Sequence, residues 1–149
     1  MKVVIGVGNP HRGDDGAGPA VAQRLAAVRL AGVDVVRSDG EPASLLDAWR
    51  GRERAVVVDA TSGAGPPGTI HRFDAGRSPL PVFLRHASTH SFGLAAAVEL
   101  ARVLGGLPPR LVVYGIEGRA FEPGAPLSPE VQRAIEDVLA RLLRELNAD

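Results

Sequence analysis

Short, strongly apolar runs alternate with longer stretches rich in Ala and Leu along the chain, which is typical of βαβ units. The first run is apolar throughout, as expected of a strand that is buried on both faces of a parallel sheet. The predicted strands cover, in chain order, residues 3–7, 33–37, 55–59, 69–73 and 111–116. Apolar residues at helical spacing predict helices over 15–29, 44–49 and 89–104, and a last helix after Ser128 with inward-facing residues between 131 and 142.

This order of elements predicts a single α/β domain over residues 1–149, with an open, twisted, mostly parallel sheet of about five strands and helices on both faces. Gly32 is expected to stop the first helix, and the Gly- and Pro-rich segment 61–68 must be a loop. If the sheet order begins second–first–third, the first and third strands are neighbours. Such three-layer sheets bind ligands beyond the carboxyl ends of their strands, here just after Val7, Val58 and Ile116.

The amino-acid composition excludes several classes of partner and of chemical site. The 149 residues carry 17 basic and 17 acidic side chains, and this zero formal charge argues against a general electrostatic grip on nucleic acid or an anionic membrane. There are no cysteines, which excludes disulfides, thiolate metal sites, iron–sulfur clusters and a cysteine nucleophile. The N-terminal apolar run is too short for a signal peptide, and no stretch approaches the roughly 20 apolar residues of a membrane span. We therefore expect a cytoplasmic protein.

A glycine-rich turn follows the first predicted strand, with the sequence GVGNPHRGDDGAG at 6–18. A dinucleotide fingerprint would need a third glycine at position 11, where this chain has His11. Pro10 would also remove an amide donor, and the carboxylates of Asp14 and Asp15 would repel a phosphate at the helix N-terminus. The turn therefore disfavours nucleotide binding.

The two adjacent aspartates have two interpretations. One of them can cap the first helix, which is a common role. Alternatively, two carboxylates beyond a strand end, with Gly16 and Gly18 leaving room around them, form a site that attracts cations. Asp59 has a similar ambiguity, because it either caps the following turn or stands where α/β folds place functional groups. If the first and third strands are neighbours, their ends lie only about 5 Å apart, so that Asp15 and Asp59 can share one ligand.

The histidines are His11, His71, His86 and His90. His71 falls in a weak predicted strand and is expected at the surface. His90 lies in the first turn of the third long helix, after a loop that can bring it to the same edge as the two carboxylates. Two carboxylates and one imidazole suit zinc, nickel or a similar divalent ion and leave a coordination position open.

Four strings carry a resemblance to the hydrogenase maturation proteases, in matching order and spacing over nearly the whole chain. They are GVGN at 6–9, GDDGAG at 13–18, VVVDA at 56–60 and STHSFGL at 88–94. The first pair is fairly specific, and the other two are useful only together. One departure is DGEP at 39–42, where the family often has a Gly-Gly-Thr-like turn that meets the precursor.

The resemblance implies an endopeptidase that removes the C-terminal extension of a nickel-loaded nickel–iron hydrogenase large-subunit precursor. It further implies a metal-sensing set, carried over to Asp15, Asp59 and His90, that engages nickel supplied by the precursor. These residues are then both metal ligands and catalytic groups, and a carboxylate of Asp15 or Asp59 can instead act as general base. No tightly held cofactor is expected. The expected partner is the precursor alone, without nucleic acid or membrane, and the protein is expected to be a monomer.

Three other functions stay open at this point. The opening GVGNP at 6–10 also resembles peptidyl-tRNA hydrolase, but the expected continuation is missing and the neutral charge fits RNA poorly. A non-catalytic nickel carrier or hydrogenase assembly factor would use the same three ligands, and a turnover assay separates it from a protease. A plain nucleotide-binding module would be revealed by a nucleotide titration.

Overall fold

The computed structural model describes residues 1–81 and 89–147, and within this part the side chains of residues 89–92 are left out of the description. Five strands form one sheet in the order β2-β1-β3-β5-β4. The strands are β1 (Lys2–Val7), β2 (Val33–Ser38), β3 (Arg54–Thr61), β4 (Ile70–Asp74) and β5 (Arg110–Glu117). Only the edge strand β4 runs antiparallel to its neighbour, so the mostly parallel sheet and the order second–first–third are confirmed.

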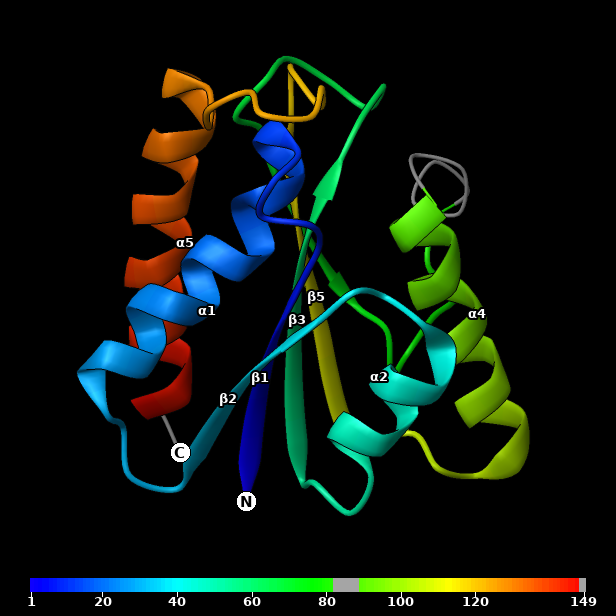
Figure 1. Cartoon of the computed structure of the whole chain (residues 1–149). Helices are drawn as coiled ribbons and strands as arrows, with labels where there is room; N and C mark the ends of the chain where they lie inside the picture. The colour runs from blue at the N-terminus through cyan, green and yellow to red at the C-terminus, as the bar shows by residue number, and fades with distance from the viewer. Residues whose placement is uncertain (82–88, 148–149) are drawn as a thin grey trace.

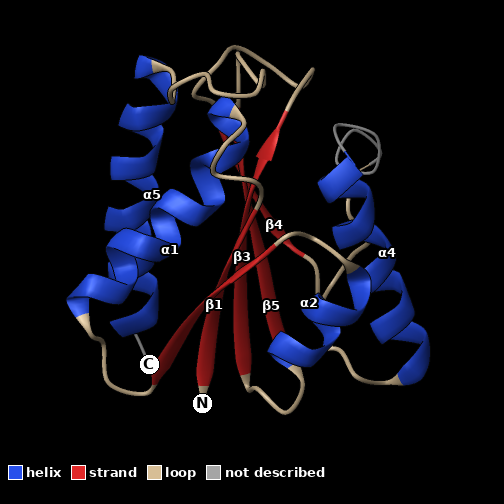
Figure 2. Ribbon diagram, viewed as in Figure 1, coloured by secondary structure: helices blue, strands red, loops and turns tan. Residues whose placement is uncertain are grey.

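Helices cover both faces of this sheet (Figures 1 and 2). They are η1 (Gly13–Gly16, a 3-10 turn), α1 (Ala17–Val28), α2 (Pro42–Trp49), α4 (Thr89–Leu104) and α5 (Pro129–Asn147). The helices α1 and α5 lie on one face, and α2 and α4 lie on the other. No helix in the described ranges is long and apolar enough to cross a membrane.

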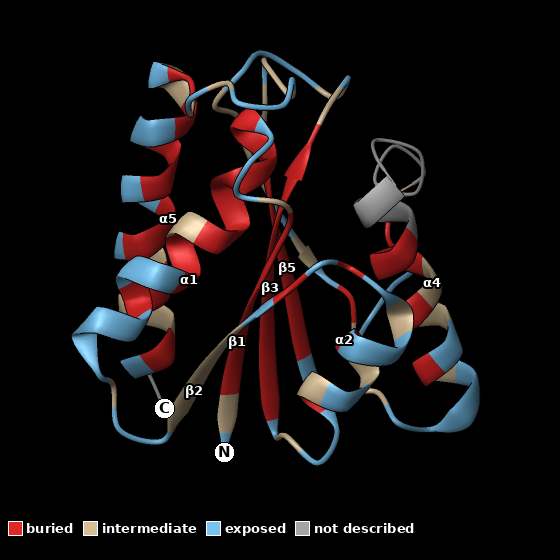
Figure 3. Cartoon of the chain, in the orientation of Figure 1, coloured by how far each residue is buried: buried red, intermediate tan, exposed pale blue. Residues whose placement is uncertain are grey.

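Two apolar cores result, one on each side of the sheet. Alternation along β3 supplies both, because Val56 and Val58 pack toward α1 and α5 whereas Val57 packs toward α2 and α4. All eight residues of β3 are buried, and Figure 3 shows the central strands mostly buried, whereas the edge strand β2 is mostly intermediate. Each fully buried valine or leucine contributes about 1.5–3 kcal/mol relative to an exposed one, which explains why the central strands are the most apolar part of the sequence.

The element ends differ in detail from the sequence prediction. The first helix does not begin at Asp15, because η1 precedes it, and it does not stop at Gly32. It ends at Val28, where Arg29 takes a left-handed conformation with φ 58° and donates its N–H to the carbonyl of Ala26. The second helix begins at Pro42, whose fixed φ suits the first helical position.

The course of the chain creates a switch point. The crossover from β1 to β2 uses α1 on one face, and the crossover from β2 to β3 uses α2 on the other. The strands β1 and β3 are therefore adjacent while the chain departs from them in opposite directions. In open α/β sheets this is where ligands bind, beyond the carboxyl ends of the strands.

Candidate active site

Glycines bring the start of α1 against the ends of β1 and β3. A Cβ atom at Gly18 would lie 2.4 Å from the carbonyl oxygens of both Val7 and Val58, and one at Gly8 would lie 2.0 Å from the carbonyl oxygen of Asp15. Real Cβ atoms do not approach so closely, so only glycine permits this packing. The result is that η1, which carries Asp14 and Asp15, lies directly over the switch point.

Asp15 is 5% exposed and lies in the 3-10 turn η1. Its Oδ2 atom accepts a hydrogen bond of 2.9 Å from the main-chain N–H of Asn9. Neither η1 nor α1 has a side-chain cap, so the interpretation of Asp14 or Asp15 as a helix cap is wrong. The reason is that both carboxylates instead accept hydrogen bonds from the loops around η1.

Asp14 is completely buried and holds the loop 118–128 against η1. Its Oδ2 atom accepts hydrogen bonds from the N–H groups of Arg119 (2.8 Å) and Ala120 (3.0 Å) and from the hydroxyl of Ser128 (2.7 Å), while Oδ1 accepts from the Ser128 N–H (2.7 Å). Burial alone would raise the pKa of the Asp14 carboxyl, but these donors together outweigh it and the pKa is lowered. Asp14 is thus an anchor for the loop 118–128, a role that its sequence position did not reveal.

Asp59 lies near the carboxyl end of β3 and is completely buried. Its Oδ1 atom accepts a hydrogen bond of 2.8 Å from the N–H of Ala60. Val58 pairs with Gly6 of β1, which places Asp59 beside Val7 at the end of that strand. The predicted neighbourhood of the two strand ends is therefore confirmed, and η1, which carries Asp15, contacts β3 at the same edge of the sheet.

His90 is the second residue of α4. Its side chain lies outside the described part of the structure, as do His86 and Ser88. The backbone position can be read from Gly93 one turn later, where a Cβ would lie 2.2 Å from the carbonyl oxygen of Gly40. Gly40 follows β2, so the first turn of α4 lies at the same end of the sheet, on the face opposite α1 (Figure 1).

The loop that departs from the family pattern lies at this junction. Gly40 has φ 92° and donates its N–H to the Ser38 hydroxyl at 3.1 Å, and the N–H of Glu41 donates to Asp39 Oδ1 at 3.0 Å. The positive φ explains why glycine is needed here. Glu41 and Asp39 are both exposed, so the loop presents carboxylates to solvent next to the first turn of α4.

The remaining described histidines are not gathered at this edge site. His11 is exposed, and His71 on β4 lies 3.4 Å from Oε1 of Glu117. His71 is only partly exposed, so its expected surface position is only partly correct. Among the side chains that the structure describes, which do not include that of His90, no three or more His, Asp or Glu residues form a group that could hold a metal ion.

Glu117 is a buried residue that the sequence analysis missed. It ends β5, is 1% exposed, and accepts hydrogen bonds from the Thr61 hydroxyl at 2.7 Å and the Ala64 N–H at 3.1 Å. It therefore holds the loop that follows Asp59 and β3. The rule that directs attention to the residue after Ile116 could have identified it.

Comparisons with known proteins agree on one group. The sequence profile of the hydrogenase maturation proteases matches residues 19–145. The hydrogenase expression/formation protein HupD of Thiocapsa roseopersicina is 27% identical over 147 residues, which are 97% of this chain and 66% of that protein. The hydrogenase 3 maturation protease of Escherichia coli is 29% identical over 143 residues, or 94% and 87% of the two chains. The solved structure of the hydrogenase maturating endopeptidase HybD from Escherichia coli superposes with a TM-score of 0.82 at 26% identity, covering 99% of this chain and 93% of that one.

Proposed function

The chain belongs to the hydrogenase maturation protease family, which makes it a hydrolase of the endopeptidase class, and we propose that it removes the C-terminal extension of a nickel-loaded hydrogenase large-subunit precursor. The proposed site consists of Asp15, Asp59 and His90, with nickel as part of the substrate rather than a resident cofactor. The chain spans about two thirds of the HupD protein above and most of the two Escherichia coli proteins.

One observation carries this proposal. Two buried carboxylates lie at the switch point, Asp15 in η1 and Asp59 near the carboxyl end of β3, and the first turn of α4 lies at the same edge. A buried carboxylate is costly unless it is hydrogen-bonded or paired with a cation. The carboxylates of Asp15 and Asp59 accept main-chain hydrogen bonds from Asn9 and Ala60 that help to orient them, and a bound cation would add further stabilisation.

The side chains of Asp15, Asp59 and His90 carry atoms that can bind a metal cation. Carboxylate oxygens and imidazole nitrogen bind zinc, nickel and similar divalent ions, and three ligands leave positions for the groups that the substrate itself supplies. In the proposed reaction, Asp15, Asp59 and His90 contact the nickel of the precursor and thereby hold the scissile bond over the switch point. Water adds to the scissile carbonyl, the carbon–nitrogen bond breaks, and the departing amine gains a proton. Asp15 or Asp59 serves as the general base for that water.

The test is intact-mass spectrometry of a hydrogenase large-subunit precursor from the same source, prepared with and without nickel and incubated with this protein. Loss of a C-terminal peptide from the nickel-loaded form alone is the expected result. No cleavage of a verified nickel-loaded precursor would instead favour a nickel carrier.

Two variants assign the site. His90→Ala should lower the cleavage rate at least 100-fold while the protein stays folded. His11→Ala removes an exposed histidine from the neighbouring turn and should cleave as the wild type does. Normal cleavage by a folded His90→Ala protein would show that the assignment of the imidazole is wrong.

A further inference from the structure

The sheet has an open edge beside the proposed site. β2 is the outermost strand on the side of β1 and pairs only with β1 among the described residues. The N–H of Lys2 donates to Gly32, and the N–H of Gly8 donates to Ser38. Because main-chain groups alternate sides along a strand, the even-numbered residues of β2 face β1 and the odd-numbered residues face outward. The outward N–H and C=O groups are those of Val33, Val35 and Arg37.

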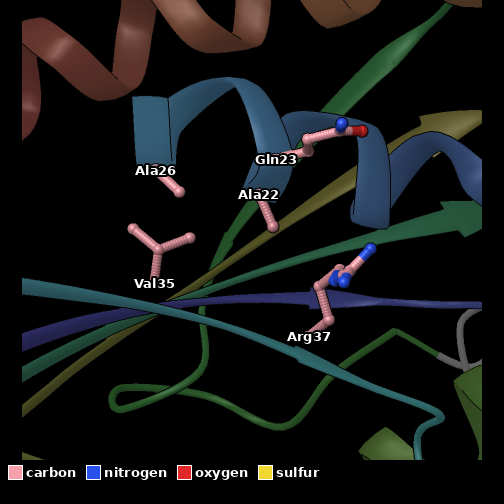
Figure 4. A pocket seen from close by; sticks show the side chains of 5 residues that line it. All are labelled: Ala22, Gln23, Ala26, Val35 and Arg37. Atoms are coloured by element: carbon pink, nitrogen blue, oxygen red, sulfur yellow. The ribbon is translucent and has the colours of Figure 1, made fainter. Parts of the chain in front are cut away.

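A groove of about 310 Å³ runs along this edge between β2 and α1. It is lined by Ala22, Gln23, Ala26, Val35 and Arg37. Figure 4 shows Val35 and Arg37 rising from the strand toward the helix, with the small alanines opposite. The alanines leave room for the side chains of an added strand, and the outward main-chain groups of β2 provide its hydrogen-bonding partners.

The charge in the groove is a single cation. Arg37 is exposed, and no ion pair or side-chain hydrogen bond of its guanidinium occurs within residues 1–81 and 89–147. By contrast, Asp34 at the other end of β2 pairs with Arg52 at 2.6 Å. A guanidinium in this position suits a carboxylate of a bound peptide.

The groove leads to the proposed site. Arg37 pairs in register with Gly6, and the next residue of β2 binds Gly8, whose Cα packs against the main chain of Asp15. Neighbouring strands lie about 4.8 Å apart, so the outer side of β2 is roughly 12 Å across the sheet from the switch point between β1 and β3, and about four residues of extended peptide span that distance. A substrate chain held at Asp15 and Asp59 would reach this edge by passing over the carboxyl ends of β1 and β2 and then bending to run along β2.

We propose that the tail removed from the precursor binds as an added strand on the outer edge of β2, with its side chains over the groove and a carboxylate against Arg37. This inference rests on the proposed function. β2 runs toward the site and the tail runs away from it, so the added strand is antiparallel to β2. Strand addition is a common mode of peptide recognition, in which main-chain hydrogen bonds provide affinity and pockets for alternate side chains provide specificity.

The first test uses kinetics with the nickel-loaded precursor. Val35→Pro removes an outward N–H that β1 does not use, so the fold should survive while the KM for the precursor rises at least fivefold with kcat unchanged. Val35→Ala keeps that N–H and should change KM less than twofold. Arg37→Glu should raise KM about tenfold, whereas the same charge reversal at the exposed Arg133 on α5 should have no effect.

The source of the carboxylate is identified on the substrate side. Converting the acidic side chains of the tail to amides raises KM for the wild type if a side chain meets Arg37. An unchanged KM points to the C-terminal carboxylate of the tail. If Val35→Pro and Arg37→Glu both cleave with wild-type KM while folded, the inference is overturned.

A second measurement does not depend on cleavage. The chain has no cysteine, so Gln23→Cys places a unique thiol in the groove and Arg133→Cys places one on α5. Precursor should slow the reaction of the first thiol with N-ethylmaleimide at least fivefold and leave the second unchanged. Equal rates at both positions overturn the inference. Protection without any cleavage by the wild type would retain the groove as a binding site and refute the proposed protease activity.

Discussion

The stability of the loop 118–128 should depend on Asp14. Among the described residues, the Asp14 carboxylate is the one buried side chain that accepts main-chain hydrogen bonds from both ends of this loop, at Arg119 and Ala120 and at Ser128. The perturbation is Asp14→Asn, which keeps the shape and removes the charge. An amide oxygen in the Oδ2 position still accepts from Arg119, Ala120 and the Ser128 hydroxyl, but its NH2 group then faces the Ser128 N–H.

The magnitude follows from these contacts. One buried donor left without an acceptor costs about 1–3 kcal/mol, and hydrogen bonds to a neutral oxygen are weaker than those to a charged one by about 1 kcal/mol each. Some of that loss is recovered by relaxation, so we expect the free energy of unfolding to fall by about 2–5 kcal/mol. This is a large share of the roughly 5–15 kcal/mol that stabilises a domain of this kind.

The effect depends on pH with a defined sign. The pKa of Asp14 is lower in the folded protein than its ordinary value of 3.8, so its charged form stabilises the fold above that pH. This contribution is lost as the pH falls through the lowered folded-state pKa. The difference in unfolding free energy between wild type and Asp14→Asn should therefore be full at pH 7 and shrink below about pH 4.

Urea denaturation monitored by the fluorescence of Trp49, the only tryptophan, measures this difference at each pH. Asp137→Asn changes an exposed carboxylate on α5 in the same way and should alter the unfolding free energy by less than about 0.5 kcal/mol. If the two variants are equally stable at pH 7, the reasoning from the buried hydrogen bonds is wrong.

Three further predictions concern other contacts. Gly18→Ala places a Cβ 2.4 Å from two carbonyl oxygens and should strongly lower the midpoint of urea unfolding. The control Gly106→Ala places a Cβ with nothing within 4 Å and should leave the midpoint unchanged. Equal midpoints for the two variants would contradict the close packing of α1. Gly93→Ala pushes α4 away from the carbonyl of Gly40 and should reduce precursor cleavage at least tenfold, which fails if the rate is unaltered in a folded variant. Tyr114 is the only tyrosine, and burial together with its hydrogen bond to Glu145 raises its pKa. Absorbance at 295 nm should therefore show that Tyr114 ionises above pH 10. The stability that its neutral form contributes is lost as the pH rises through this raised pKa. A midpoint at the ordinary tyrosine value would contradict the described contact.

Much of the fold was predictable because burial on both faces forces the central strands to be continuously apolar. The runs at 3–7, 55–59 and 111–116 are strands in the structure, each extended by one to three residues in total. The order second–first–third, which doubly wound sheets often have at their start, is also the order in the structure. The element ends were less predictable, since α1 ends at Val28 with Arg29 in a left-handed conformation, three residues before the predicted stop at Gly32.

The candidate site was likewise predictable only in part. Motif and strand position alone selected Asp15 and Asp59, because the carboxyl ends of adjacent parallel strands must meet at one edge of the sheet. The sequence could not separate Asp14 from Asp15, since both stand in the same short turn. Only the tertiary structure directs one carboxylate to the loop 118–128 and the other to the turn at Asn9.

The sequence by itself therefore determined the α/β architecture, the edge of the sheet that carries the carboxylates, and the family resemblance, because periodicity and local motifs encode these. The tertiary structure decided the anchoring role of Asp14, the burial of Glu117 under the loop after β3, and the open edge of β2 beside Arg37. Each of these depends on contacts between segments far apart in the chain, and no local pattern specifies which donors a folded loop will bring to a carboxylate.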